Sequence, residues 1–201
     1  MSVRIDLHVH TRRYSPCSRI DPARLVPQAV KAGLDGLVIT EHHYQWSEEE
    51  LADATHNTAP PGFLLLSGLE YTSTCGDVLI YGLSREDAAR LEPGWSPAEV
   101  IREARQRGAA CIAAHPTRRE NGYDERILNL PLTAIETCSM RLEPHERRLA
   151  SKIAEAAKLR ETAASDAHVL QEVGRYATMF LDPIGTIFEL RDALLRGRFY
   201  I

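Results

Sequence analysis

Short apolar runs alternate along this chain with segments whose apolar residues recur at helical spacing. Seven of the runs predict β-strands, at residues 3–9, 35–40, 63–69, 77–82, 109–114, 132–137 and 161–165. Most of them are continuous apolar stretches, which is typical of strands buried on both faces of a parallel sheet.

Helix boundaries between these strands are marked by capping residues. Asp21 precedes Pro22, which predicts a helix that starts there and ends before Gly33. The apolar spacing over 143–159 predicts another helix. Three further starts have the sequence of a capping box, at residues 47–50, 96–99 and 186–189. Strands that alternate with helices predict an α/β fold, either an open doubly wound sheet or a closed barrel. No glycine-rich loop follows the first strand, which weakens a Rossmann interpretation.

Histidines and carboxylates gather at one end of the predicted strands. His8 and His10 share a face of the first strand, because residues two apart point the same way. Six of the seven strands deliver such a residue at or just after their carboxyl ends, namely His8, His10, Glu41, His42, His43, Glu70, His115, Glu136, Asp166 and His168. In barrel enzymes that rim carries the chemistry. Mixed imidazole and carboxylate donors in this number predict two or three divalent ions of Zn, Mn or Fe.

Length and charge limit the remaining possibilities. The 201 residues are enough for one domain, 1–201, and the net charge of −4 argues against dedicated nucleic-acid binding. No long apolar run predicts a membrane span. The four cysteines are scattered, which favours free thiols and a cytoplasmic location. The oligomeric state is not predicted.

The order and separation of five motifs resemble the PHP (polymerase and histidinol phosphatase) family, and in particular its stand-alone, bacterial-type members. The motifs are DLHVHT at 6–11, ITEHH at 39–43, SGLE at 67–70, AHPTR at 114–118 and SDAH at 165–168. The resemblance implies a single-domain, distorted (β/α)7 TIM-like barrel with a trinuclear metal site.

The resemblance also implies a ligand set. One ion would be held by His8, His10, Glu70 and Asp166, a second by Glu70 and His115, and a third by His42 and His168. Three positions depart from the family pattern. Glu41 stands where the family often has an aspartate in the second motif, next to the expected ligand His42. Cys17 is the only evident soft ligand after the first motif, and Asp77 stands where the family often has a histidine for the second ion.

The activity that the resemblance implies is hydrolysis of a small phosphomonoester, of the nucleotide or sugar phosphate type, by a metal-bridging hydroxide. The expected partner is therefore a small phosphorylated molecule. Asp166 and His168 are the candidates for handling the proton. Arg118 and then Arg13 are the candidates for binding phosphate, because both follow motifs on the same rim. The alternatives are an amidohydrolase-type hydrolase with the same metals and a non-catalytic, metal-binding regulatory domain.

Overall fold

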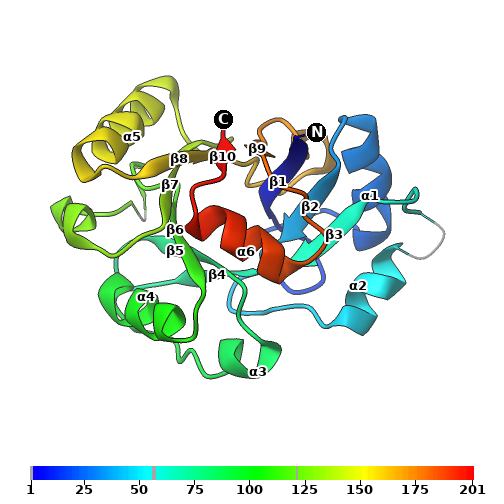
Figure 1. The fold of residues 1–201 in the computed structure, drawn as a ribbon, viewed down its shortest axis with the longest axis horizontal. Helices are drawn as coiled ribbons and strands as arrows, with labels where there is room; N and C mark the ends of the chain where they lie inside the picture. Colours follow the sequence, from blue (N-terminus) through cyan, green and yellow to red (C-terminus); the bar gives the residue numbers. More distant parts are fainter. Residues whose placement is uncertain (1, 56–57, 121) are drawn as a thin grey trace.

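The computed structural model describes residues 2–55, 58–120 and 122–201, which form two five-stranded β-sheets with helices on their outer faces (Figure 1). The first sheet has the order β10-β9-β1-β2-β3 and the second has the order β4-β5-β6-β7-β8. The strands are β1 (Val3–Val9), β2 (Gly36–Ile39), β3 (Leu64–Ser67), β4 (Leu69–Thr72), β5 (Asp77–Tyr81), β6 (Ala110–Ala114), β7 (Ala134–Cys138), β8 (Arg160–Ala163), β9 (Thr178–Phe180) and β10 (Phe199–Tyr200).

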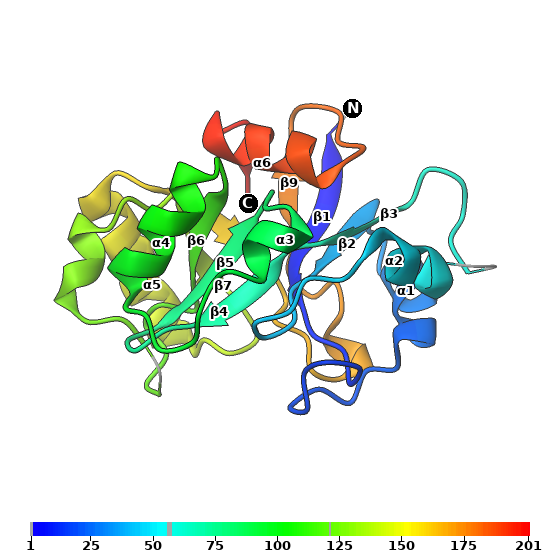
Figure 2. The ribbon, with the colours of Figure 1, turned by 90° about the horizontal axis from the view of Figure 1, so that it is seen from below.

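Most of the helices cover the sheets from outside, whereas the last one along the chain packs against the residues between the sheets (Figure 2). The helices are α1 (Pro22–Lys31), α2 (Glu48–Thr55), α3 (Arg85–Ala88), α4 (Pro97–Gln106), α5 (Pro144–Ala157) and α6 (Ile187–Leu195), with 3-10 turns at Glu125–Asn129 and Leu170–Glu172. Four of the predicted helix starts have their caps. Asp21 accepts from Ala23 N–H, and Thr186 accepts from Glu189 N–H. Ser47 with Glu50, and Ser96 with Glu99, form capping boxes.

Three apolar clusters hold these layers together. The first lies between the sheets and includes Ile5, Leu7, Tyr81 and Phe180, with α6 packed against it through Leu190. The second lies between the second sheet and α4 and α5, and the third lies between the first sheet and α1 and α2. None of the helices in the described ranges is long and apolar enough to span a membrane.

The predicted (β/α)7 barrel is wrong, although the α/β class is right. The run 63–69 does not form one strand but bends at Gly68 into β3 and β4. A turn at 73–76, with Gly76 at φ 86°, then joins β4 directly to β5, so these two strands pair antiparallel. The next pair, β5 with β6, is antiparallel too. Because the strand–helix alternation fails here, the parallel ladder that would close a barrel is interrupted.

Isolated bridges connect the two sheets in place of a ladder. In the described part of the chain these are the parallel bridges His42↔Glu70 and Val9↔Ala167. Figure 2 shows α6 at one end of the molecule and the loop that follows β1 at the other. The bridges lie at the latter end, where the carboxyl ends of β1 and β2 meet the start of β4.

Candidate metal centre

Four side chains form a first ligand group: His8, His10, Glu70 and Asp166. The Nε2 atoms of the two histidines lie 3.0 Å apart. Glu70 Oε2 lies 3.1 Å from His10 Nε2 and 3.4 Å from His8 Nε2, and Asp166 Oδ1 lies 3.4 Å from both. Ligands of a tetrahedral Zn²⁺ at 2.0–2.1 Å are roughly 3.3 Å apart. The four atoms are therefore spaced as the ligands of one ion would be.

A second ligand group consists of Glu70, Asp77 and His115. His115 Nε2 lies 3.1 Å from Glu70 Oε1 and 3.8 Å from Asp77 Oδ2. Glu70 therefore presents one oxygen to each group, as a bridging carboxylate does. Asp77 occupies the place that the sequence had suggested for it.

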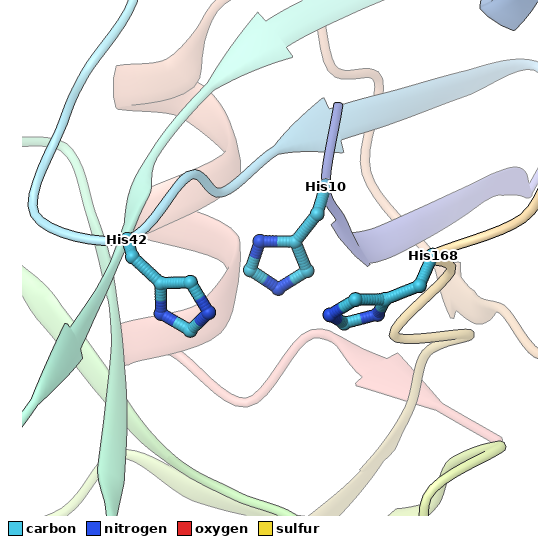
Figure 3. Close-up of side chains that lie close together, drawn as sticks. All are labelled: His10, His42 and His168. Atoms are coloured by element: carbon cyan, nitrogen blue, oxygen red, sulfur yellow. The ribbon is translucent and has the colours of Figure 1, made fainter. Parts of the chain in front are cut away.

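A third ligand group brings together the rings of His10, His42 and His168, which come from three separate segments and converge (Figure 3). The His10 ring centroid lies 4.7 Å from each of the other two. His42 and His168 were expected as one pair, and the structure adds His10 to them. Cys17 lines the same cavity but is not a member of this group.

Unpaired buried atoms test whether these residues fit a cation. Asp166 Oδ1, Asp77 Oδ1 and His115 Nδ1 are buried and form no hydrogen bond. An unsatisfied buried polar group costs about 1–3 kcal/mol, and more when it is charged. Asp166 Oδ1 lies within the first group, 3.4 Å from both histidine Nε2 atoms, where a divalent ion would satisfy it. The donor sets thus support divalent metal binding.

When no metal is bound, protons on the histidines balance part of the negative charge of the carboxylates. Burial lowers the pKa of His10, but the nearby carboxylates of Asp166 and Glu70 favour the protonated ring, outweigh burial and raise the pKa to about 9. The same carboxylates raise the pKa of His8 against its burial. In return, and also against burial, His8 lowers the pKa of Glu70 and Asp166. Metal must therefore displace protons from the two histidines in order to bind.

Buried carboxylates outside the groups orient the ligands. Glu136 lies with Oε1 at 3.1 Å from His8 Nδ1 and accepts from His115 N–H at 2.8 Å through Oε2. Asp6 accepts from Ser165 N–H at 2.9 Å and from Gly174 N–H at 3.0 Å. Its burial raises its pKa to about 6. The roles of these two residues were open or unpredicted from sequence, because their partners are distant in the chain.

Two members of the ligand groups hold unusual backbone conformations. His115 has φ 27° and Asp166 has φ 49°, in the left-handed region that non-glycine residues rarely adopt. Such strain persists where the surroundings impose it and is common at functional sites. At Asp166, the guanidinium of Arg141 donates to the carbonyl at 3.3 Å from both Nε and Nη2.

A cavity of about 360 Å³ opens over the three groups. It is lined by Cys17, His42, Glu70, Thr72, Asp77, His115, Arg118, Asp166 and His168. Arg118, the first candidate for phosphate binding, reaches Asp77 Oδ2 at 3.5 Å. Arg13, the second, is not part of the lining and lies 3.4 Å from Glu50 Oε1. Arg141 was missed because it follows β7 in a bend, without a recognisable motif.

Comparisons with known proteins agree with this architecture. A family model described as PHP-associated matches residues 144–199. A structure described as a metal-dependent phosphoesterase from Bifidobacterium adolescentis has 19% identity and a TM-score of 0.64, with 82% of this chain and 87% of that chain covered. A two-domain protein from Bacteroides vulgatus, which contains a PHP-like metal-dependent phosphoesterase, has 20% identity and a TM-score of 0.76. The match covers 99% of this chain and 64% of that one. No curated protein matches the chain.

Endonuclease Q from Pyrococcus furiosus, a lesion-specific endonuclease, has the same fold, with 16% identity and a TM-score of 0.72. This chain is covered completely and spans 58% of that enzyme. A second endonuclease Q structure contains a 27-mer duplex with an abasic lesion at the active site, at 15% identity and a TM-score of 0.64. The match covers 98% of this chain and 57% of that one.

The shared fold is α/β and open rather than barrel-shaped. The matched PHP-associated region and the PHP-like phosphoesterases with the same fold support the predicted resemblance to the PHP family.

The predicted partner is wrong. A small phosphorylated molecule, with no nucleic acid, was expected, but endonuclease Q carries a DNA duplex on this fold. The net charge of −4 does not decide this question, because the local charges at a site, rather than the total charge, determine whether it attracts phosphate.

Proposed function

We propose that this protein is a metal-dependent phosphoesterase that hydrolyses phosphate esters in DNA. The observation that carries the proposal is the set of three ligand groups, which share Glu70 and His10 and leave carboxylate oxygens of Asp77 and Asp166 unpaired. Divalent ions bound there would supply hydroxide at neutral pH and neutralise charge on the phosphoryl oxygens.

Two arginines are suited to hold the phosphate over this centre. Arg118 lines the cavity, and its Nε donates to Glu120 O at 2.8 Å, which fixes the guanidinium plane. Arg141 is anchored between the Asp166 carbonyl and Glu172. Planar guanidinium groups bind phosphate oxygens in pairs, so these positions favour a phosphate ester over an uncharged substrate. Arg13 lies farther out, beside Glu50.

Asp166 and His168 remain our candidates for handling the proton. Burial lowers the pKa of His168, so this imidazole is neutral near pH 7 and can accept a proton. Its Nδ1 lies 3.0 Å from the Asp166 carbonyl oxygen and 3.3 Å from Asp166 Oδ1. Since both side chains also belong to the ligand groups, their effects on metal content must be measured together with their effects on rate.

The DNA substrate is supported by the endonuclease Q structures, which share the fold over nearly the whole of this chain. The test measures cleavage of end-labelled oligonucleotides as single strands, as duplexes and as duplexes with an abasic site. The protein is reconstituted in turn with Mn²⁺, Zn²⁺ and Fe²⁺. Asp166→Asn keeps the shape of the side chain, and the matched control is Asp182→Asn, at a half-buried carboxylate paired with Arg198 outside the cavity.

We expect metal-dependent cleavage that Asp166→Asn abolishes, with loss of bound metal, and that Asp182→Asn leaves intact. Cleavage by metal-free protein would refute the metal centre. Absence of cleavage in every oligonucleotide, with metal shown to be bound, would refute DNA as the substrate. If bis(p-nitrophenyl) phosphate is not hydrolysed either, the phosphoesterase assignment fails, and hydrolysis of C–N or C–O bonds by the same centre is favoured.

A further inference from the structure

An aromatic–arginine stack, formed by Arg13, Tyr14, Tyr44 and Arg85, lies beside the metal centre. The two tyrosine rings are stacked with centroids 3.9 Å apart and planes 26° apart. The guanidinium carbon of Arg85 lies 5.5 Å from the Tyr44 centroid, and that of Arg13 lies 5.5 Å from the Tyr14 centroid. Each tyrosine therefore carries a guanidinium group within cation–π distance.

Ser15 links this stack to the ligands. Its hydroxyl oxygen accepts from His42 N–H at 3.2 Å and lies 3.3 Å from His10 Nδ1. Tyr14 directly precedes Ser15, and Tyr44 follows His42 by two residues. Glu50, on α2, accepts from the hydroxyl groups of both tyrosines. The position of the stack relative to the third ligand group is thus set by short covalent and hydrogen-bonded connections.

The charge on the stack is available to a ligand. Arg85 is exposed, donates to Tyr44 Oη at 2.7 Å and, in the ranges that the structure describes, forms no ion pair. Arg13 is 40% exposed, with Glu50 as its partner at 3.4 Å. Long arginine side chains normally lose rotamer freedom when they bind. Stacking on tyrosine holds these two in place beforehand, as a preformed phosphate contact requires.

The depth of the centre restricts what can reach it. The side chains of His10, Glu70 and Asp166 are at most 2% exposed, at the base of the cavity of about 360 Å³. The backbone of an unpaired strand bends sharply enough to carry a phosphate into such a cavity, whereas a regular duplex is stiff over this length. The nucleotides that flank this phosphate then pass over the rim, beside the stack.

We infer that the aromatic–arginine stack binds the phosphate backbone of an unpaired DNA strand next to the ester held at the metal centre. This inference rests on the proposed function for the identity of the strand. Arg85 and Arg13 provide phosphate contacts without base specificity, as in other single-strand binding surfaces.

The experiment measures the affinity of fluorescein-labelled dT12 by anisotropy between 50 and 300 mM salt, in the presence of a chelator so that no hydrolysis occurs. Loss of one phosphate contact lowers the slope of log K against log salt by about 0.7 for a single strand. We expect this change in Arg85→Gln and in Arg13→Gln. Tyr44→Leu, which removes the ring beneath Arg85, should weaken binding in the same direction, whereas Tyr44→Phe should retain most of it. The control is Arg90→Gln, at an exposed arginine that pairs with Glu86.

Hydrolysis of bis(p-nitrophenyl) phosphate by the metal-loaded protein separates the two proposals. If wild type binds dT12 with the expected slopes but hydrolyses neither ester nor oligonucleotide, the stack stands and the proposed function fails. If it hydrolyses the ester while Arg85→Gln and Arg13→Gln bind dT12 with the wild-type slope, the stack is refuted and the phosphoesterase stands. If Arg90→Gln lowers the slope as much as Arg85→Gln does, binding is a diffuse charge effect and the inference is wrong.

Discussion

Glu136→Gln should weaken metal binding although Glu136 belongs to none of the ligand groups. In the wild type both carboxylate oxygens act as acceptors, one toward His8 Nδ1 at 3.1 Å and one toward His115 N–H at 2.8 Å. This arrangement keeps the proton of neutral His8 on Nδ1 and leaves the Nε2 lone pair free, toward His10 and Glu70.

The amide of glutamine has only one acceptor. If its oxygen retains the His115 N–H, its NH₂ group faces His8 Nδ1, and the ring must place its proton on Nε2, where the metal would bind. If the amide is flipped, two N–H donors oppose each other at His115. Loss of such an orienting carboxylate typically lowers metal affinity by about 10- to 100-fold. That corresponds to about 1.4–2.7 kcal/mol.

The assay is a competition titration of Zn²⁺ or Mn²⁺ against a chromogenic chelator, with circular dichroism to establish that the variant is folded. Glu161→Gln is the matched control, because Glu161 lies on the neighbouring strand β8 and bonds Ser151 Oγ outside the cavity. A folded Glu136→Gln protein with wild-type metal affinity would refute the reasoning about the His8 tautomer.

Three further predictions concern the stability of the same centre. Chelation should lower the melting temperature by roughly 5–10 °C relative to protein with free metal at 100 times Kd, since such binding contributes about 2.7 kcal/mol; an unchanged melting temperature would contradict metal binding. In metal-free protein the raised pKa of His10 contributes stability that is fully present below pH 6.5 and is lost as pH rises through about 9, up to about 3 kcal/mol for this group. Urea unfolding at pH 6.5 and 9.5 measures the loss, and equal stabilities at the two pH values would show that His10 is not held protonated. Asp6→Ala leaves the N–H groups of Ser165 and Gly174 without their acceptor. It should lower the free energy of unfolding in urea by at least about 2 kcal/mol. A loss below about 0.5 kcal/mol, the size expected of a surface substitution, would show that Asp6 does not hold the loop that contains these residues.

The sequence could predict the gathering of the ligands because it depends on local alternation and on the placement of motifs at strand ends. His8, His10, Glu70, His115 and Asp166 all have their side chains where that argument expects them. The closed barrel was wrong because strand direction depends on a four-residue turn at 73–76 that the apolar runs do not reveal. The contacts of Glu136, Arg141 and Tyr44 depend on partners 25 to 128 residues away, or on ring stacking, which no periodicity records.

The failure of the barrel to close and the position of the metal centre are connected. Within the described residues, the sheets are joined at this end by the single bridges His42↔Glu70 and Val9↔Ala167. The first ligand group takes two members, His8 and His10, from the first sheet, one, Glu70, from the second, and one, Asp166, from the loop that follows the second sheet. Any ion held there links the two sheets across the seam, where the backbone offers few hydrogen bonds. Metal binding and the docking of the two sheets are therefore thermodynamically coupled. A chelator should for this reason lower the melting temperature of the whole chain and not only its activity.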